Sequence, residues 1–174
     1  MCRPCIEHVV NKYRVKTTYF EDDNLTFDLK RFEAICDKII EKDIKFNWET
    51  PNGIRADYLT LNILKKMKKS GCQSVFVGIE SGDQFVLDNI IDKSLKLKNV
   101  IKFAEVCKKI GLKTGAFYVI GFPGETKENM MKTVEFALML KRKYDVGIHL
   151  LFATPSYSTR LYEECKKKGI SERS

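Results

Sequence analysis

The sequence predicts an α/β fold in which helices cover a parallel sheet. Short runs rich in β-branched and aromatic residues alternate with amphipathic stretches at intervals of roughly 30 to 40 residues, which is typical of βαβ units. The central run, residues 74–79, is apolar on both sides, as expected for a strand buried in a parallel sheet. The 174 residues, 44% of them hydrophobic, suffice for one domain with its own core.

Five runs have the composition of strands. Each ends at a polar cluster or a turn signal, and each is followed by an amphipathic segment. The predicted strands are residues 17–21, 44–48, 74–79, 114–120 and 147–153. Right-handed crossovers between parallel strands bring the five loops that follow them to one edge of the sheet.

The segments between the strands have apolar residues at helical spacing and residues that cap helices. Asp28, Thr60 and Thr126 can accept hydrogen bonds from first-turn amides. Gly71 and Gly111 can end helices in a left-handed conformation. The predicted helices begin near Asp28, Thr60, Ser94 and Lys127, with the last turns of a helix within residues 1–14, a short amphipathic stretch at 86–91 and a final helix that ends at Gly169.

The composition narrows the classes of function. The net charge is +8, but the lysines cluster in helical segments without interleaved aromatic residues, which favours solvated helix faces over a nucleic-acid surface. No apolar run approaches the roughly 20 residues of a membrane span, and the first residues lack the apolar stretch of a signal peptide. We therefore predict a cytoplasmic protein. In that compartment, six irregularly spaced cysteines indicate free thiols rather than a disulfide framework.

Polar residues and glycines gather where the five predicted strands end. Because these loops share one edge of the sheet, their side chains are expected to form a site. A set of polar turns that merely lead into the helices is the plain alternative. The residues predicted at this edge are Asp22, Asp23, Asn24, Glu49, Asn52, Arg55, Glu80, Ser81, Gly121, Gly124, Glu125, Thr154 and Ser156.

The most specific short motif is G-F-P-G-E-T at residues 121–126. Its two glycines allow backbone amides to approach a ligand, its proline stiffens the loop, and Thr126 can cap the next helix. A tight strand-to-helix turn without a ligand would have the same pattern. The motif is not a phosphate-binding loop, because no Gly-Lys-Ser/Thr follows, and it is not the dinucleotide-binding fingerprint.

Other residues at this edge keep more than one role open. The Asp-Asp-Asn run at 22–24 could bind a metal, cap a helix or contact a substrate, although three adjacent side chains point in different directions. Arg55 could pair with a ligand carboxylate or with Asp57. His149 lies inside an apolar strand, which favours a core or wall residue over a catalytic base.

Four motifs in order resemble the radical S-adenosylmethionine (SAM) superfamily, and most of all its cobalamin-domain-containing and methylthiotransferase-like branch. They are F-E-D-D-N-L-T at 20–26, N-G-I-R-A-D at 52–57, V-G-I-E-S-G-D-Q-F-V-L-D at 77–88 and V-I-G-F-P-G-E-T at 119–126. The resemblance covers residues 15–165. It implies a partial, TIM-like (β/α) barrel, of which this chain has five parallel strands out of an expected six.

The resemblance also implies cofactors and residue roles. In the family, a [4Fe-4S] cluster on a C-x-x-x-C-x-x-C loop binds SAM and cleaves it reductively to a 5′-deoxyadenosyl radical. Cobalamin takes part in some members, and flavodoxin or ferredoxin supplies the electron. Glu80 and Ser81 would lie at the ribose and methionine end of SAM, and Arg55 at its carboxylate or at the substrate. The remaining implied residues are Gly121, Phe122, Pro123, Gly124 and Glu125, at the adenosyl group through their backbone, and Asp22, Asp23 and Asn24, on the cluster and substrate side.

The cluster motif is where the sequence departs from the family. No C-x-x-x-C-x-x-C occurs in the chain, and Cys2 and Cys5 form a C-x-x-C without a third cysteine nearby. We therefore predict that residues 1–174 are an N-terminally truncated radical SAM core, without the first strand, the cluster loop or a metal site. Residues 1–14 would be the remnant of the preceding helix and residues 15–165 the core.

Three hypotheses for function follow from these residues. The first is a fragment of a radical SAM enzyme that acts on a small molecule and cannot start the radical alone, so that whether this chain is itself an enzyme stays open. The second is an iron-independent barrel enzyme that uses Glu80, Arg55 and Asp23. The third is a non-catalytic barrel that binds a nucleotide-like ligand.

Overall fold

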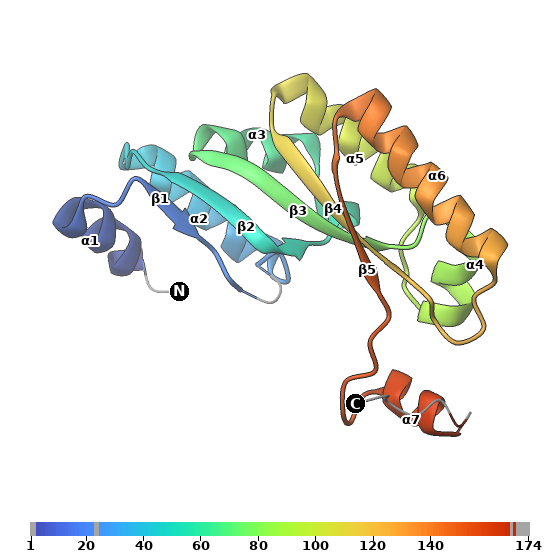
Figure 1. The fold of residues 1–174 in the computed structure, drawn as a ribbon. Coiled ribbons are helices and arrows are strands. Elements are labelled where there is room, and N and C mark those ends of the chain that lie inside the picture. The colour runs from blue at the N-terminus through green and yellow to red at the C-terminus, as the bar shows by residue number, and fades with distance from the viewer. Residues whose placement is uncertain (1–2, 23–24, 168, 170–174) are drawn as a thin grey trace.

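The computed structural model describes residues 3–22, 25–167 and 169, and shows a parallel five-stranded sheet (Figure 1). The strand order β1-β2-β3-β4-β5 follows the chain, and every neighbouring pair is parallel. The strands are β1 (Thr17–Tyr19), β2 (Asn47–Ile54), β3 (Cys72–Glu80), β4 (Lys113–Ile120) and β5 (Gly147–Phe152). The predicted parallel α/β fold is therefore confirmed.

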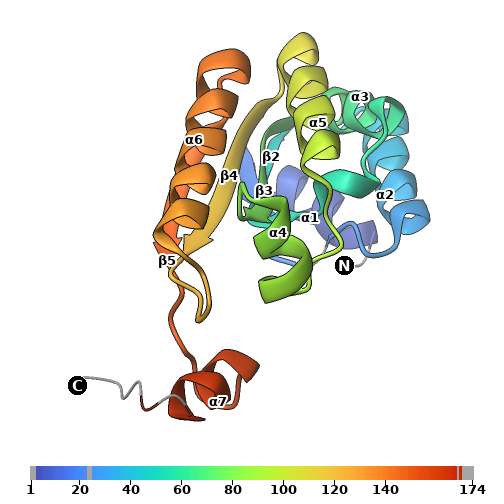
Figure 2. The same cartoon turned by 90° about the vertical axis from the view of Figure 1, so that its right-hand side faces the viewer.

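Helices cover one face of the sheet, and we call the other face the open face (Figure 2). The covering helices are α2 (Leu29–Glu41), α3 (Leu61–Lys69), α5 (Leu97–Ile110) and α6 (Lys127–Tyr144). The remaining described elements are α1 (Arg3–Tyr13) beside β1, η1 (Ala56–Tyr58), α4 (Gln84–Val86), the π-helical turn η2 (Leu87–Ile91) and α7 (Arg160–Lys167). Among the described helices, none combines the length and hydrophobicity needed to cross a bilayer.

The predicted caps set the helix ends. The side chains of Asp28, Thr60 and Thr126 each accept a hydrogen bond from a backbone amide three residues on, at the starts of α2, α3 and α6. Asn129 completes a reciprocal capping box with Thr126. Gly111 ends α5 with φ 68°, a conformation that suits glycine.

The core lies between the sheet and its helices. On β3, Val75, Val77 and Ile79 point into it and are at most 1% exposed, whereas the residues between them are only partly buried. This alternation places the side chains of Phe76 and Glu80 on the open face. The helices therefore hold the central strand rigidly while its other face stays accessible.

The strand predicted at 44–48 is wrong in its bounds, because β2 runs over Asn47–Ile54. The register with β3 shifts between Thr50 and Ile54, and Gly53 there has φ 90°. Such an irregularity lets the strand accommodate a proline and a glycine that would interrupt a regular ladder. Glu49 and Asn52 therefore lie within a strand and not in the loop after it, and Asn52 Nδ2 donates to the carbonyl of Glu21 at 3.2 Å.

Candidate functional site

The end of β3 presents a paired carboxylate and ammonium group on the open face. Lys93 Nζ lies 2.9 Å from Glu80 Oε1, and both side chains are about one quarter exposed. Gly78 provides the room, since a Cβ there would meet Glu80 Oε1 at 2.8 Å and Lys93 Nζ at 3.3 Å. Glu80 itself has φ 68°, which non-glycine residues seldom adopt. Strain of this kind at the end of a central strand is typical of functional sites.

The π-helical turn η2 brings Lys93 to this pair. Asp92 ends the turn in a left-handed conformation with φ 58°, and the amide of Lys93 donates to the carbonyl of Leu87 at 2.8 Å. Single π-helical turns are rare in proteins overall, but those that occur are frequently found at functional sites. Sequence reasoning missed Lys93. The signal that could have found it is the amphipathic stretch 86–91, which is too short for a regular helix and is followed at once by Asp and Lys.

Ser81 does not face the open edge. Its side chain is fully buried, and its hydroxyl lies 2.9 Å from Thr133 Oγ1 on α6. The same Thr133 oxygen accepts from the amide of Gly82 at 3.0 Å. The hydroxyl of Ser81 therefore fastens the loop after β3 to α6, and the placement of Ser81 at the ribose and methionine end of SAM stays a prediction.

Asp83 adds further contacts between the loop after β3 and α6. Its carboxylate accepts from Asn129 Nδ2 at 2.7 Å and from the amide of Phe85 at 2.9 Å, and Lys132 Nζ lies 3.4 Å away. Burial raises the pKa of Asp83, but the hydrogen bonds from Asn129, Phe85 and Lys132 outweigh it, so this pKa lies below its usual value. The position of Glu80 thus depends on a buried polar network on its far side.

In the 121–126 loop, a glutamate side chain accepts hydrogen bonds from the backbone amides of the loop itself. Glu125 Oε2 accepts from the amides of Gly121 at 2.6 Å and Phe122 at 3.1 Å. Those two amides are therefore engaged within the loop, and the expected backbone contacts of residues 121–125 with the adenosyl group stay a prediction. The other oxygen, Glu125 Oε1, is buried and has no hydrogen-bond partner among the described residues. Gly124, with φ 97° and no atom near its would-be Cβ, leaves the loop surface open beside Pro123.

Arg55 pairs with Asp57, which is one of the two roles that the sequence left open. Its guanidinium donates to both carboxylate oxygens of Asp57, at 3.1 and 2.7 Å, and lies 4.4 Å from the ring centre of Tyr58. The hydrogen bond to Asp57 raises the pKa of Arg55. Arg55 Nη2 also lies 3.4 Å from the carbonyl of Ser94, next to Lys93. The salt bridge with Asp57, one of the two alternatives, is therefore formed, and Arg55 supports the loop that carries Lys93. Its contact with the carboxylate of SAM or with the substrate stays a prediction.

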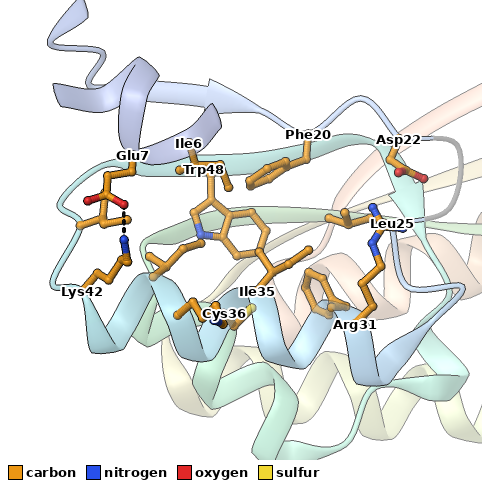
Figure 3. Close-up of a pocket in the computed structure, with 14 residues that line it drawn as sticks. Ile6, Glu7, Phe20, Asp22, Leu25, Arg31, Ile35, Cys36, Lys42 and Trp48 are labelled. Atoms are coloured by element: carbon orange, nitrogen blue, oxygen red, sulfur yellow. Dashed lines mark hydrogen bonds and ion pairs between the residues drawn. The ribbon is translucent and has the colours of Figure 1, made fainter. Parts of the chain in front are cut away.

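A separate pocket of about 350 Å³ lies beneath β1 (Figure 3). Its lining includes core residues Phe20, Phe32 and Trp48 and, at its rim, the ion pair of Glu7 with Lys42. Asp22 lines this pocket, whereas Asp23 and Asn24 lie outside the described residues. The lining is mostly an extension of the hydrophobic core, so we assign the chemistry to the end of β3.

Three rings occupy the middle of the open face. Phe76 on β3 and Phe117 on β4 stack with ring centres 5.5 Å apart, and His149 on β5 contacts both, at 5.1 and 5.4 Å. His149 is exposed, and its imidazole makes no hydrogen bond with the residues that the structure describes. The sequence left a core or a wall position open for His149; the structure places it on the exposed face of the sheet, and its role stays a prediction.

The described cysteines do not fit an iron–sulfur cluster. Cys36, Cys72, Cys107 and Cys165 are buried, and among the described residues no group of three or more His, Cys, Asp or Glu side chains could hold a metal. Burial raises the pKa of Cys36 and Cys107 to about 11, so both stay protonated thiols at neutral pH. We therefore derive no chemical step through a cluster on these residues.

Comparisons with known proteins place the fold and the family. The profile of the radical SAM superfamily matches residues 6–137. An uncharacterized methyltransferase of Pyrococcus horikoshii is 32% identical over 152 residues, which are 87% of this chain and 32% of the relative. A putative methylthiotransferase of Methanocaldococcus jannaschii is 31% identical over 160 residues, covering 82% of this chain and 34% of the relative. The chain thus spans about a third of the length of these curated relatives.

A solved structure shares the fold. It is the radical SAM methyltransferase TsrM from Kitasatospora setae, with cobalamin and a [4Fe-4S] cluster bound. The superposition has a TM-score of 0.69 and 15% sequence identity, and covers 81% of this chain and 28% of TsrM. At that identity the likeness establishes the fold, a partial TIM-like barrel, and carries no residue roles.

Proposed function

This chain belongs to the radical SAM superfamily, and from that premise we propose that its strand-end site, Glu80 with Lys93, binds SAM. We further propose that the catalytic unit to which this barrel contributes cleaves SAM reductively to a 5′-deoxyadenosyl radical. Relatives that are methyltransferases and methylthiotransferases support transfer of a one-carbon or methylthio group to a small molecule. The family uses SAM together with a [4Fe-4S] cluster. Cobalamin, which TsrM binds, and a flavodoxin or ferredoxin reductant belong to the proposal.

The observation that carries this proposal is the charge pair at the end of β3. A carboxylate that is already oriented by Lys93 can accept hydrogen bonds from the two ribose hydroxyls of SAM. The ammonium of Lys93 can in turn approach the carboxylate of the methionyl group. Glu125 Oε1, buried without a partner at the end of the next strand, offers an acceptor for an N–H donor such as the adenine amine.

The chemistry that a bound cluster supplies in this family is the electron for cleavage of the sulfonium. On this chain, the derived roles are binding and orientation only. Gly78 leaves room for the Glu80–Lys93 pair. Ser81 and Asp83 hydrogen-bond α6 and thereby fix the loop that follows Glu80. Arg55 contacts the loop that carries Lys93. The site is therefore preorganised by contacts that a ligand does not disturb.

Substitution of Glu80 tests the proposal. We expect Glu80→Gln to weaken SAM binding by about 10- to 100-fold, because a hydrogen bond to a charged group contributes about 1.5 to 3 kcal/mol. Equilibrium dialysis with radiolabelled SAM measures the dissociation constant. The matched control is Glu135→Gln, which makes the same chemical change on an exposed position of α6. If Glu80→Gln and Glu135→Gln bind SAM equally tightly, Glu80 is not part of the site. If the parent chain binds ATP as tightly as SAM, a nucleotide-binding module is favoured over a SAM enzyme.

A further inference from the structure

A groove of about 770 Å³ lies at the edge of the sheet where β1 and β2 begin. Four cationic residues line it, and we call it the basic groove and define it by them: Arg14, Lys16, Lys45 and Lys69. Asp43 is the only carboxylate among its described lining residues, and it pairs with Lys45. The other three cations make no ion pair with any carboxylate that the structure describes.

The strand starts hold these cations close together. The amide of Asn47, the first residue of β2, donates to the carbonyl of Lys16 at 2.8 Å. Gly71 has φ 100°, and a Cβ there would meet the carbonyl oxygen of Phe46 at 2.2 Å, so only glycine permits this close turn after α3. The starts of β1 and β3 are two strand spacings apart, which is about 10 Å. Lys16 and Lys69 therefore reach the groove from the two sides of β2.

A purely structural role does not account for all of these charges. A lysine in the last turn of a helix offsets the helix dipole, which explains Lys69 at the end of α3. That effect falls off within the last turn, and Lys16 and Lys45 lie three and four residues beyond the ends of α1 and α2. Cationic side chains gathered around one groove repel each other, and a bound anion removes that repulsion.

We propose that the basic groove binds a small molecule that carries a diphosphate group. A single phosphate monoester has about 1.5 to 2 negative charges at neutral pH, fewer than the three unpaired cations, whereas a diphosphate balances them. The guanidinium of Arg14 can donate to two phosphate oxygens at once, and Lys16 and Lys69 bind as point charges. The apolar side chains of Ile40 and Ile44 also line the groove, so the part of the ligand next to the diphosphate is apolar.

The basic groove is separate from the candidate cofactor site. β3 begins beside the groove at Cys72 and ends at Glu80, about 26 Å further along the strand. A diphosphate in the groove therefore does not reach the Glu80–Lys93 pair. The groove is a second site, and this inference does not rest on the proposed function.

Isothermal titration calorimetry with inorganic pyrophosphate in a low-salt buffer tests the proposal. Lys69→Met should weaken binding about three- to tenfold, which is less than a buried charged hydrogen bond would cost because solvent and salt screen an open groove. The matched control is Lys102→Met, which removes the same charge from an exposed position in the middle of α5, outside the groove, and should change affinity less than about twofold. Equal weakening by both variants, or no saturable binding to the parent chain, would overturn the groove as a diphosphate site.

Acetylation of lysines, measured by mass spectrometry, locates the ligand. Pyrophosphate should slow acetylation of Lys16 and Lys69 and leave Lys102 unchanged. A pentauridylate RNA is the second probe, because its single charges are spread along a backbone instead of gathered in one group. Equal slowing at all three lysines, or tighter binding of the RNA than of pyrophosphate, would contradict the proposal, and the second result would identify a nucleic-acid surface instead.

Discussion

Trp48→Ala is expected to lower the free energy of unfolding by about 3 to 5 kcal/mol, the range for a fully buried large aromatic side chain. Trp48 is 1% exposed and packs edge-on against Phe20 and Phe32, with ring centres 5.2 and 6.2 Å away. Its Nε1 also donates to the carbonyl of Ser70 at 3.0 Å. The substitution would enlarge the pocket beneath β1 and leave that carbonyl without its donor.

Urea-induced unfolding measures this loss. Trp48→Phe keeps one aromatic ring but removes the five-membered ring with its N–H donor, so it leaves a smaller cavity than Trp48→Ala and should cost less, about 1 to 2 kcal/mol. Tyr157→Ala, at a side chain that is 81% exposed, should stay within about 0.5 kcal/mol of the parent chain. A cost below about 1 kcal/mol for Trp48→Ala would mean that the region beneath β1 is loosely packed, and the pocket in Figure 3 would then become a rival ligand site.

Asp83→Asn is expected to destabilise the chain by about 1 to 3 kcal/mol at neutral pH, because one buried donor then loses its acceptor. Asp83 receives hydrogen bonds from Asn129 and from the amide of Phe85, and the side chain is 8% exposed. An amide has a single acceptor oxygen, so it cannot serve both donors as the carboxylate does. The loop after β3 would then separate more readily from α6.

The effect of Asp83→Asn should depend on pH in a known direction. The pKa of Asp83 in the folded state lies below the unfolded value of 3.8. Its contribution to stability is therefore complete above about pH 5 and is lost as the pH falls through the folded pKa. The difference in free energy of unfolding between the parent chain and Asp83→Asn should therefore shrink below pH 4. A difference that is constant from pH 7 to pH 3 would contradict the assigned network.

Periodic signals in the sequence predicted most of the fold. Capping by Asp28, Thr60 and Thr126 depends on contacts within a few residues, so it can be recognised locally. The bounds of β2 could not be predicted in this way. Its proline and glycine are local turn signals, and only the irregular pairing with β3 keeps them in the sheet.

The candidate site was predicted less completely, because its contacts join residues far apart in the chain. Glu80 was found from its position after a buried strand. Lys93 reaches it only through a π-helical turn, and Ser81 turns away because its hydroxyl shares a hydrogen bond with the hydroxyl of Thr133, 52 residues later. The amides of the 121–126 loop looked available until the structure paired two of them with Glu125. A residue type at a strand end thus predicts a site, but its partners decide whether it can bind a ligand.

Hydrogen–deuterium exchange with and without saturating SAM tests the central claim most directly, because it locates the ligand on this chain. We predict slower exchange in residues 78–96 and 119–126, which hold Glu80, Lys93 and the loop after β4. Residues 29–45, which border the pocket beneath β1, should exchange at an unchanged rate. Slower exchange confined to residues 29–45, or no change in 78–96 while dialysis shows SAM bound, would contradict the assignment of the cofactor site to the end of β3.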